Sequence, residues 1–167
     1  MAAQLDPSSE FAALVKQLHR TPNDPRVKQA VVGRLPEMRA LAKTNPLALF
    51  RLAQVYSPSS SQYKQMIMES AARGCTNAML SACQLLLKSE TSEDMITAVH
   101  YMRIIQNSND SYITKLSKEL LDNYPRFAEE FNSRSKESAY HSNLRFFRVQ
   151  DENNSVGTAE VIKGPSV

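Results

Sequence analysis

Apolar residues along most of the chain recur with the spacing of an α-helix. Near the N-terminus, for example, they fall at positions i, i+3, i+4 and i+7, and this set comprises Phe11, Leu14, Val15 and Leu18. Such spacing places one apolar stripe along a helix, where it can pack against a neighbour. Similar stripes recur as far as about residue 131, and no segment alternates as a strand would. The pattern therefore predicts an all-α protein.

Polar residues that can cap a helix precede many of these stripes, and three of them are followed by proline: Asp6-Pro7, Asp24-Pro25 and Asn45-Pro46. A side-chain oxygen satisfies free backbone N–H groups at a helix start, and proline is well tolerated in the first turn. Thr91 and Asp94 have the spacing of a capping box, and Gly74 suits a helix end. We expect helices over residues 7–20, 25–43, 46–56, 62–73, 76–88, 91–106 and 110–122, with a last one starting at Pro125.

Pro36 complicates the second of these helices. Its ring clashes with the carbonyl four residues back and it has no N–H to donate, and Gly33 nearby makes a break easier. We expect either a kink or two helices, over residues 25–33 and 36–43.

The domain organisation follows from a change in character near residue 140. Residues 1–140 are expected to form a single helical domain, with a repeat-like part over 46–122. Residues 141–167 are largely polar, contain glycine and proline and lack a period, so they are expected to form an extended or disordered tail.

Composition narrows the class of protein further. With only four glycines among 167 residues, a loop-rich β fold is disfavoured, and the 42% of apolar residues can form a core. The net charge of +3 is weak, so no DNA partner is expected. No run approaches the roughly 20 apolar residues of a membrane span, and the N-terminus lacks the features of a Sec signal peptide. We expect a cytoplasmic protein without a transmembrane segment.

Two segments of the chain echo each other. MESAARGCTNAM at residues 68–79 and MRIIQNSNDSYI at residues 102–113 each contain the end of one helix, a polar turn and the start of the next. Gly74 in the first turn corresponds to Ser108 in the second, 34 positions later. A period of this length without strands is typical of stacked helical hairpins, with 46–56 paired to 61–73 and 75–88 to 92–106, stacked in one rotational sense.

Residues 48–121 resemble Sel1-like repeats, which are related to tetratricopeptide repeats. Ala48, Leu52-Ala53 and Tyr56 fit the pattern of the first helix, and Ser70-Ala71, Gly74 and Ala78 fit the end of the second. His100-Tyr101-Met102-Arg103 fits the Trp-Tyr-x-Lys part of the next copy. The chain departs from the family in having SPSSSQ in place of a Gly-rich loop, and in lacking the Gly and Ala of the second copy. The resemblance implies a short stack of helical hairpins, and an irregular helical bundle is the alternative.

The function that this resemblance implies is protein binding without catalysis or cofactors. In such stacks the first helix of each hairpin lines a groove, which would place seven polar residues there: Arg51, Gln54, Ser81, Gln84, Lys88, Lys115 and Lys118. The lysines imply a protein partner with an acidic segment. The chain is therefore expected to be an adaptor or regulator. Sel1-like proteins are common in bacteria, including intracellular pathogens, so one version is a bacterial effector delivered into a host cell by a non-Sec route.

An enzyme with a thiol nucleophile is a second hypothesis. Cys75 follows Gly74 at an expected helix start, where the helix dipole can lower the pKa of a thiol. The simpler interpretation is a small residue in a tight turn. Cys83 lies about 12 Å further along the helix axis, too far for a disulfide. No histidine is spaced for a metal site; His100 is expected to pack in the repeat, and His19 and His141 to face solvent.

A third hypothesis is an RNA or anionic-membrane binder that uses residues 126–149. This segment combines basic residues with the aromatic pair Phe146-Phe147, a mixture that can bind either ligand. Its acidic residues Glu129, Glu130 and Glu137 dilute the charge. The basic residues are Arg126, Arg134, Lys136, Arg145 and Arg148.

Overall fold

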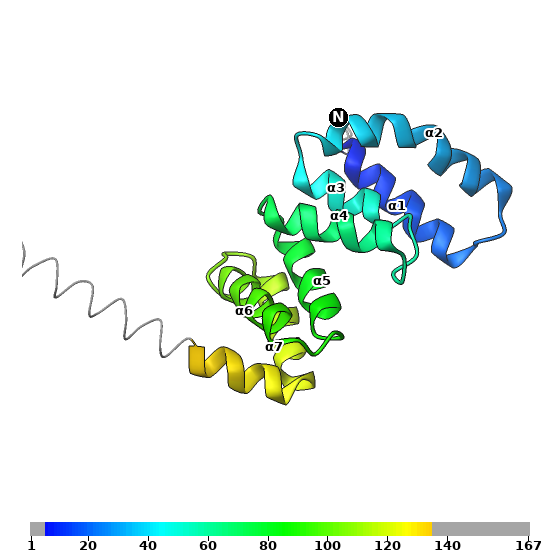
Figure 1. The fold of residues 1–167 in the computed structure, drawn as a ribbon. Coiled ribbons are helices and arrows are strands. Elements are labelled where there is room, and N and C mark those ends of the chain that lie inside the picture. Colours follow the sequence, from blue (N-terminus) through cyan, green and yellow to red (C-terminus); the bar gives the residue numbers. More distant parts are fainter. Residues whose placement is uncertain (1–5, 135–167) are drawn as a thin grey trace, which may run out of the picture. The chain divides into compact units, whose positions relative to one another are not determined.

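The computed structural model describes residues 6–134, and their regular secondary structure is entirely helical (Figure 1). The all-α prediction is thereby confirmed. Seven helices precede a further helical stretch at residues 125–134: α1 (Pro7–Arg20), α2 (Pro25–Ala42), α3 (Pro46–Ala53), α4 (Ser61–Ala72), α5 (Thr76–Leu86), α6 (Ser92–Gln106) and α7 (Ser111–Asn123).

The chain divides into two compact units, Met1–Tyr124 and Pro125–Val167. The first contains α1 to α7, and the described part of the second is the helical stretch 125–134. The boundary that the sequence suggested near residue 140, and the expected tail 141–167, lie outside the described residues.

Polar caps fix where most of the helices begin. The Asp24 carboxylate accepts a hydrogen bond from the backbone N–H of Arg26 at 2.9 Å, and Asn45 Oδ1 accepts one from Leu47 at 3.0 Å. Thr91 Oγ1 accepts one from the N–H of Asp94 at 3.2 Å. These contacts satisfy N–H groups that have no partner within the helix, so the predicted starts are correct.

The helix α2 is continuous through Pro36, so of the two expected outcomes, a kink or two helices, the division into two helices is wrong. Pro36 is exposed, and the carbonyl that loses its partner belongs to Val32, whose side chain is 62% exposed. Water can therefore solvate that carbonyl. Around Gly33 the space is open, and one missing hydrogen bond on the solvent side does not end the helix.

Buried leucines, valines and alanines connect the first three helices. One core cluster joins Phe11 and Val15 of α1, Val31 and Met38 of α2, and Leu49 and Leu52 of α3, together with Ala42 and Ala48. Further buried residues continue through the later helices, and these include Ile67, Ala82, Cys83, Met102, Ile105 and Ile113. The core of this unit thus consists mainly of aliphatic and methionine side chains, with Phe11 among the largest that are fully buried.

The helices of the first unit pack in a regular order. Each helix packs against the next along the chain, from α1 on α2 to α6 on α7. In addition α1 packs on α3, α3 on α5, and α5 on α7, whereas no two of α2, α4 and α6 pack to a comparable extent. We refer to α1, α3, α5 and α7 as the odd-numbered row. The expected hairpins α3–α4 and α5–α6 are therefore packed pairs, and α4 lies against α5.

Candidate functional site

Two of the seven expected groove residues interact with the first helix. The Arg51 guanidinium on α3 donates a hydrogen bond to Ser9 Oγ at 3.2 Å and another to Ser8, and it pairs with Asp6 at 3.3 Å. The Ser8 hydroxyl donates to the Asp6 carboxylate and, together with the nearby Arg51 charge, lowers the pKa of Asp6. The Asp6 carboxylate therefore interacts with Ser8 and Arg51 and makes no side-chain capping hydrogen bond at the start of α1.

Gln54, at the end of α3, is held in a similar way. Its backbone carbonyl accepts a hydrogen bond from His19 Nε2 at 3.1 Å, and its own amide donates to the Phe50 carbonyl at 3.2 Å. Both Arg51 and Gln54 are half-buried. The Arg51 side chain and the Gln54 backbone carbonyl join α3 to α1, and these contacts were not foreseen from the sequence.

The three expected groove residues on α5 and just after its end differ in how exposed they are. Ser81 is half-buried, whereas Gln84 and Lys88 are exposed. Lys88 lies just beyond the end of α5 at Leu86. These positions leave the side chains of Gln84 and Lys88 accessible to a partner.

The two lysines of α7 line a common polar hollow. We call it the α7 hollow; its volume is about 430 Å³, and its lining consists of Ser108, Asn109, Ser111, Thr114, Lys115 and Lys118. Both lysines are exposed, and within residues 6–134 neither forms an ion pair. The sequence analysis identified the lysines but missed the four hydroxyl and amide residues beside them. Ser111 and Thr114 share one helix face with Lys115 and Lys118, so the helical spacing could have revealed these two, whereas Ser108 and Asn109 lie in the turn before α7.

This face of α7 lies away from the core. The buried residues of the helix are Ile113, Ser117 and Leu120, and at 100° per residue they project to the side opposite Lys115 and Lys118. Ser117 accepts a hydrogen bond from Gln106 of α6 at 2.8 Å and so ties α7 to α6. The lysines are therefore presented outward by a helix whose other side is fixed.

The charges around the α7 hollow are mixed, although its lining contains no carboxylate. Glu119 and Asp122 are exposed further along α7. Asp110 directs Oδ1 to the backbone N–H groups of Tyr112 and Ile113, at 3.0 and 3.1 Å, and so occupies the helix start itself. The hollow thus offers two ammonium groups and several neutral hydrogen-bonding groups to a ligand.

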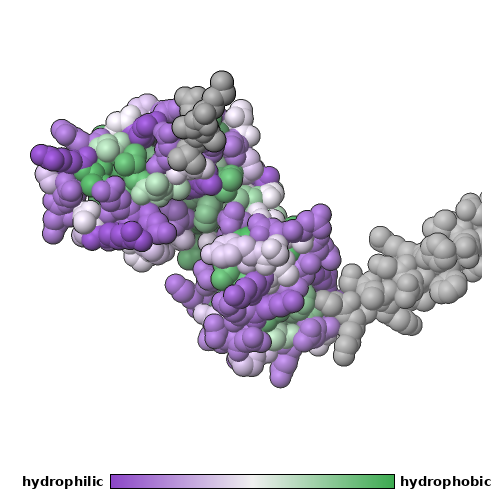
Figure 2. All heavy atoms as spheres, turned by 180° about the vertical axis from the view of Figure 1, so that it is seen from behind, coloured by the Kyte–Doolittle hydropathy of each residue, from purple (hydrophilic) through white to green (hydrophobic). Residues whose placement is uncertain are grey.

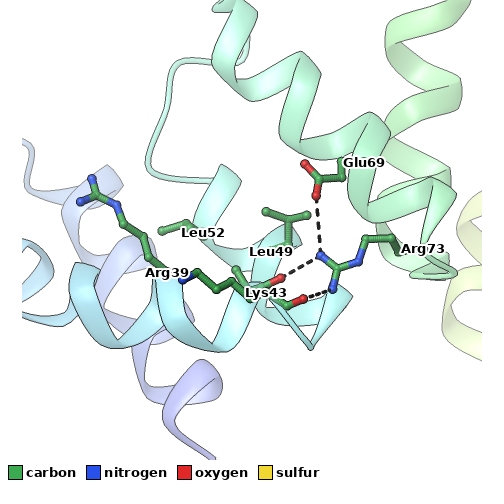
Figure 3. Close-up of a pocket in the computed structure, with 7 residues that line it drawn as sticks. Arg39, Lys43, Leu49, Leu52, Glu69 and Arg73 are labelled. Carbon is green, nitrogen blue, oxygen red and sulfur yellow. Dashed lines mark hydrogen bonds and ion pairs between the residues drawn. The ribbon is translucent and has the colours of Figure 1, made fainter.

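A second hollow, which the sequence did not reveal, lies where α2, α3 and α4 meet (Figure 3). We call it the α2–α4 hollow; its volume is about 490 Å³, and it is lined by Arg39, Ala42, Lys43, Leu49, Leu52, Glu69 and Arg73. Its lining comes from three helices, so no spacing within one helix could indicate it. Figure 2 shows apolar atoms reaching the surface between hydrophilic side chains on the face seen from behind.

The two cysteines are free thiols in buried positions. Cys75 occupies the N-cap position of α5 but makes no capping hydrogen bond. Cys83 donates a hydrogen bond to the Ala98 carbonyl at 3.4 Å, and burial raises its pKa to about 12. Both sulfur atoms are thus largely shielded from solvent.

The histidines differ in part from expectation. His19 is exposed, as expected, but His100 is exposed as well, and it is the adjacent Tyr101 that is buried. The His100 ring lies 5.8 Å from the Tyr101 ring, centroid to centroid, so its packing is limited to the edge of the core, and Tyr101 is the residue that enters it. His141 lies outside the described residues. Within the described part of the chain, no cluster of three or more His, Cys, Asp or Glu residues could hold a metal ion.

Only the first part of the basic-aromatic segment 126–149 is described. There Arg126 is exposed, Phe127 is buried, and Arg134 pairs with Glu130 one turn away. The remaining members, from Lys136 to Arg148, lie outside the described residues. One of the two described arginines thus already has an acidic partner.

Comparison of the chain with family models, with curated proteins and with solved structures found no match. Across residues 6–134, none of the helices combines the length and apolarity that crossing a membrane would require.

Proposed function

We propose that this chain is a non-catalytic protein-interaction module that binds an acidic segment of a partner protein along its odd-numbered row. The observation that carries the proposal is the packing order of the helices. The odd-numbered helices contact one another in succession, whereas the even-numbered helices do not. This asymmetry is what a stack of helical hairpins produces, with the first helix of each hairpin facing a shared surface.

The exposure and contacts of the polar side chains on the odd-numbered row limit which part of it can bind a partner. The Arg51 side chain is engaged with α1 and that of Gln54 with the Phe50 carbonyl of its own helix, so both are less available to a partner. Gln84 on α5, Lys88 just beyond its end, and Lys115 and Lys118 on α7 are exposed, and α5 and α7 pack against each other. We therefore assign partner binding to the α5–α7 part of the row, and most of all to the α7 hollow.

The chemistry of that surface favours carboxylates. Three of its four exposed residues are lysines, and the α7 hollow adds hydroxyl and amide groups that can bind an extended segment. Each exposed ion pair contributes only about 0.2–1 kcal/mol, so the affinity must come from several contacts. The charges instead orient the partner and accelerate its association.

The experiment begins with recovery of a partner by pull-down and mass spectrometry. The affinity of the purified partner is then measured for the parent protein and for Lys115→Glu/Lys118→Glu. The matched control is Lys28→Glu/Lys64→Glu, which changes the net charge equally at exposed positions of α2 and α4. We expect at least a tenfold loss for the α7 variant and less than a twofold loss for the control.

Equal affinities of the two double variants would reject the α7 assignment. The resemblance to Sel1-like repeats extends the proposal to a regulator or adaptor, including a bacterial effector delivered into a host cell. Whether the recovered partner is a bacterial or a host protein, combined with a translocation assay on a reporter fusion, decides between a cytoplasmic role and delivery.

A further inference from the structure

We infer that the α2–α4 hollow is a second and separate recognition site, which binds a segment of a partner protein that carries an apolar side chain beside a carboxylate. The inference goes beyond the binding surface proposed for α5 and α7, because the two sites share no lining residue. Its basis is the combination of an apolar floor with a cationic rim.

The floor of the hollow is formed by α3. Leu49 and Leu52 are one turn apart on this helix and are 6% and 4% exposed, and Ala42 at the end of α2 adjoins them. Both α2 and α4 pack on α3, but they do not pack to a comparable extent on each other. The leucines consequently close a gap between the two outer helices, and Figure 3 shows them between Arg39 and Lys43 on one side and Glu69 and Arg73 on the other.

The rim carries three cations and one carboxylate. Arg39 and Lys43 are exposed, and neither side chain has a hydrogen-bond or ion-pair partner within residues 6–134. Glu69 interacts only at 3.8 Å with Arg73. The free charge of the rim is therefore positive, and it lies on the α2 side.

Arg73 makes the end of α2 compatible with an anionic ligand. Its guanidinium donates to the carbonyl oxygens of Ala42 and Lys43, both at 2.8 Å (Figure 3). Uncapped carbonyls at a helix end carry a partial negative charge that would repel a carboxylate. Because Arg73 occupies them, Arg39 and Lys43 can act on a ligand without that opposition, and Arg73 is a positioning residue.

The lining selects one class of ligand over others. An apolar side chain covers the leucine floor, and a carboxylate next to it reaches Arg39, whose planar guanidinium can bind both oxygens. A purely apolar ligand would leave the cations without partners. Nucleic acid is disfavoured because no aromatic residue lines the hollow to stack on a base. A peptide segment that combines leucine or phenylalanine with aspartate or glutamate satisfies both requirements.

The test uses the full chain and a fluorescein-labelled peptide with two adjacent leucines flanked on both sides by glutamates. Binding is followed by fluorescence anisotropy at low salt. Two control peptides replace the leucines by serines or the glutamates by glutamines. Testing the apolar contact from the peptide side avoids substitution of Leu49 and Leu52, which belong to the core. We expect saturable binding of the first peptide and about a tenfold loss of affinity for each control.

The protein variant for this site is Arg39→Gln/Lys43→Gln. Its matched control, Arg26→Gln/Lys28→Gln, removes the same two charges from exposed positions near the start of the same helix. We expect about a tenfold weaker peptide affinity for the first variant and a change within about twofold for the second. Thermal melts of both variants show whether they remain folded. The comparison of the three peptides uses the parent protein, so it does not depend on the stability of the variants.

Three results would overturn the inference. One is the absence of saturable binding by the leucine–glutamate peptide. Another is an equal loss of affinity in the two double variants, which would show a response to total charge alone. The third is a concentration-dependent dimer in sedimentation velocity that Arg39→Gln/Lys43→Gln dissociates, because a second copy of the chain would then be the occupant.

Discussion

The two hollows of this protein are built in opposite ways. The α2–α4 hollow is assembled from three helices, rests on core leucines and includes an arginine that caps a helix end. The α7 hollow is formed by one face of one helix and the preceding turn, and its lining is entirely polar. The first hollow therefore couples binding to stability, whereas residues of the second can change with little effect on the fold.

The largest expected effect is a loss of stability when a leucine in the floor of the α2–α4 hollow is truncated. Leu52 is 4% exposed, so Leu52→Ala should lower the free energy of unfolding by about 2–5 kcal/mol. Leu116 on α7 is half-buried, and Leu116→Ala should cost less. Chemical denaturation of both variants gives the comparison. An equal loss at the two positions would show that the leucine floor contributes no more to stability than a half-buried position of α7.

Arg73 gives the next largest effect. Arg73→Gln removes two charge-assisted hydrogen bonds to the end of α2 and should cost about 1–3 kcal/mol. Arg39→Gln at the rim of the same hollow should change stability by less than about 0.5 kcal/mol, because that side chain is exposed and unpaired among the described residues. Thermal melts of the two single variants separate a structural arginine from one that is free to bind.

The core between α5 and α6 contains a titratable group, Cys83, unlike the leucine floor. Burial raises the pKa of Cys83 in the folded protein from 9.0 to about 12, so above pH 9 only the unfolded chain loses this proton. The contribution of Cys83 to stability is therefore fully present below pH 9 and is lost as the pH rises toward 12, by up to about 1.4 kcal/mol per pH unit. Cys83→Ala should show a shallower decline between pH 9 and 10.5 in urea titrations. Equal slopes in parent and variant would contradict this assignment.

The smallest effect is expected at the α7 hollow itself. Lys115→Glu/Lys118→Glu should alter the free energy of unfolding by no more than about 0.5 kcal/mol, since both residues are exposed and face away from the core. Urea denaturation of this variant beside Lys28→Glu/Lys64→Glu measures it. A loss above about 1 kcal/mol would mean that these lysines have a structural role.

Local signals in the sequence predicted local structure well. Asp24, Asn45 and Thr91 cap helices as their positions suggested. Gly74 adopts a φ of 101°, a left-handed conformation that glycine accepts at little cost. These features depend on a few neighbouring residues, so one segment of sequence contains all the information.

Features that depend on tertiary packing could be predicted less well from the sequence. Pro36 suggested a break in the helix because the sequence alone does not show that it faces solvent. Arg51 was assigned to a groove because its partners Asp6 and Ser9 lie 45 and 42 positions away in the sequence, so these contacts depend on the tertiary fold. The lysines of the α7 hollow could be identified because they share one helix face. The α2–α4 hollow could not, because it requires the arrangement of three helices.

Hydrogen–deuterium exchange with the recovered partner tests the central claim most directly. Binding should slow exchange in the turn before α7 and in its first turns, residues 108–118, and also toward the end of α5. Protection confined to residues after 134, with residues 108–118 unchanged, would contradict the proposed surface and make the late arginine–phenylalanine segment the better candidate.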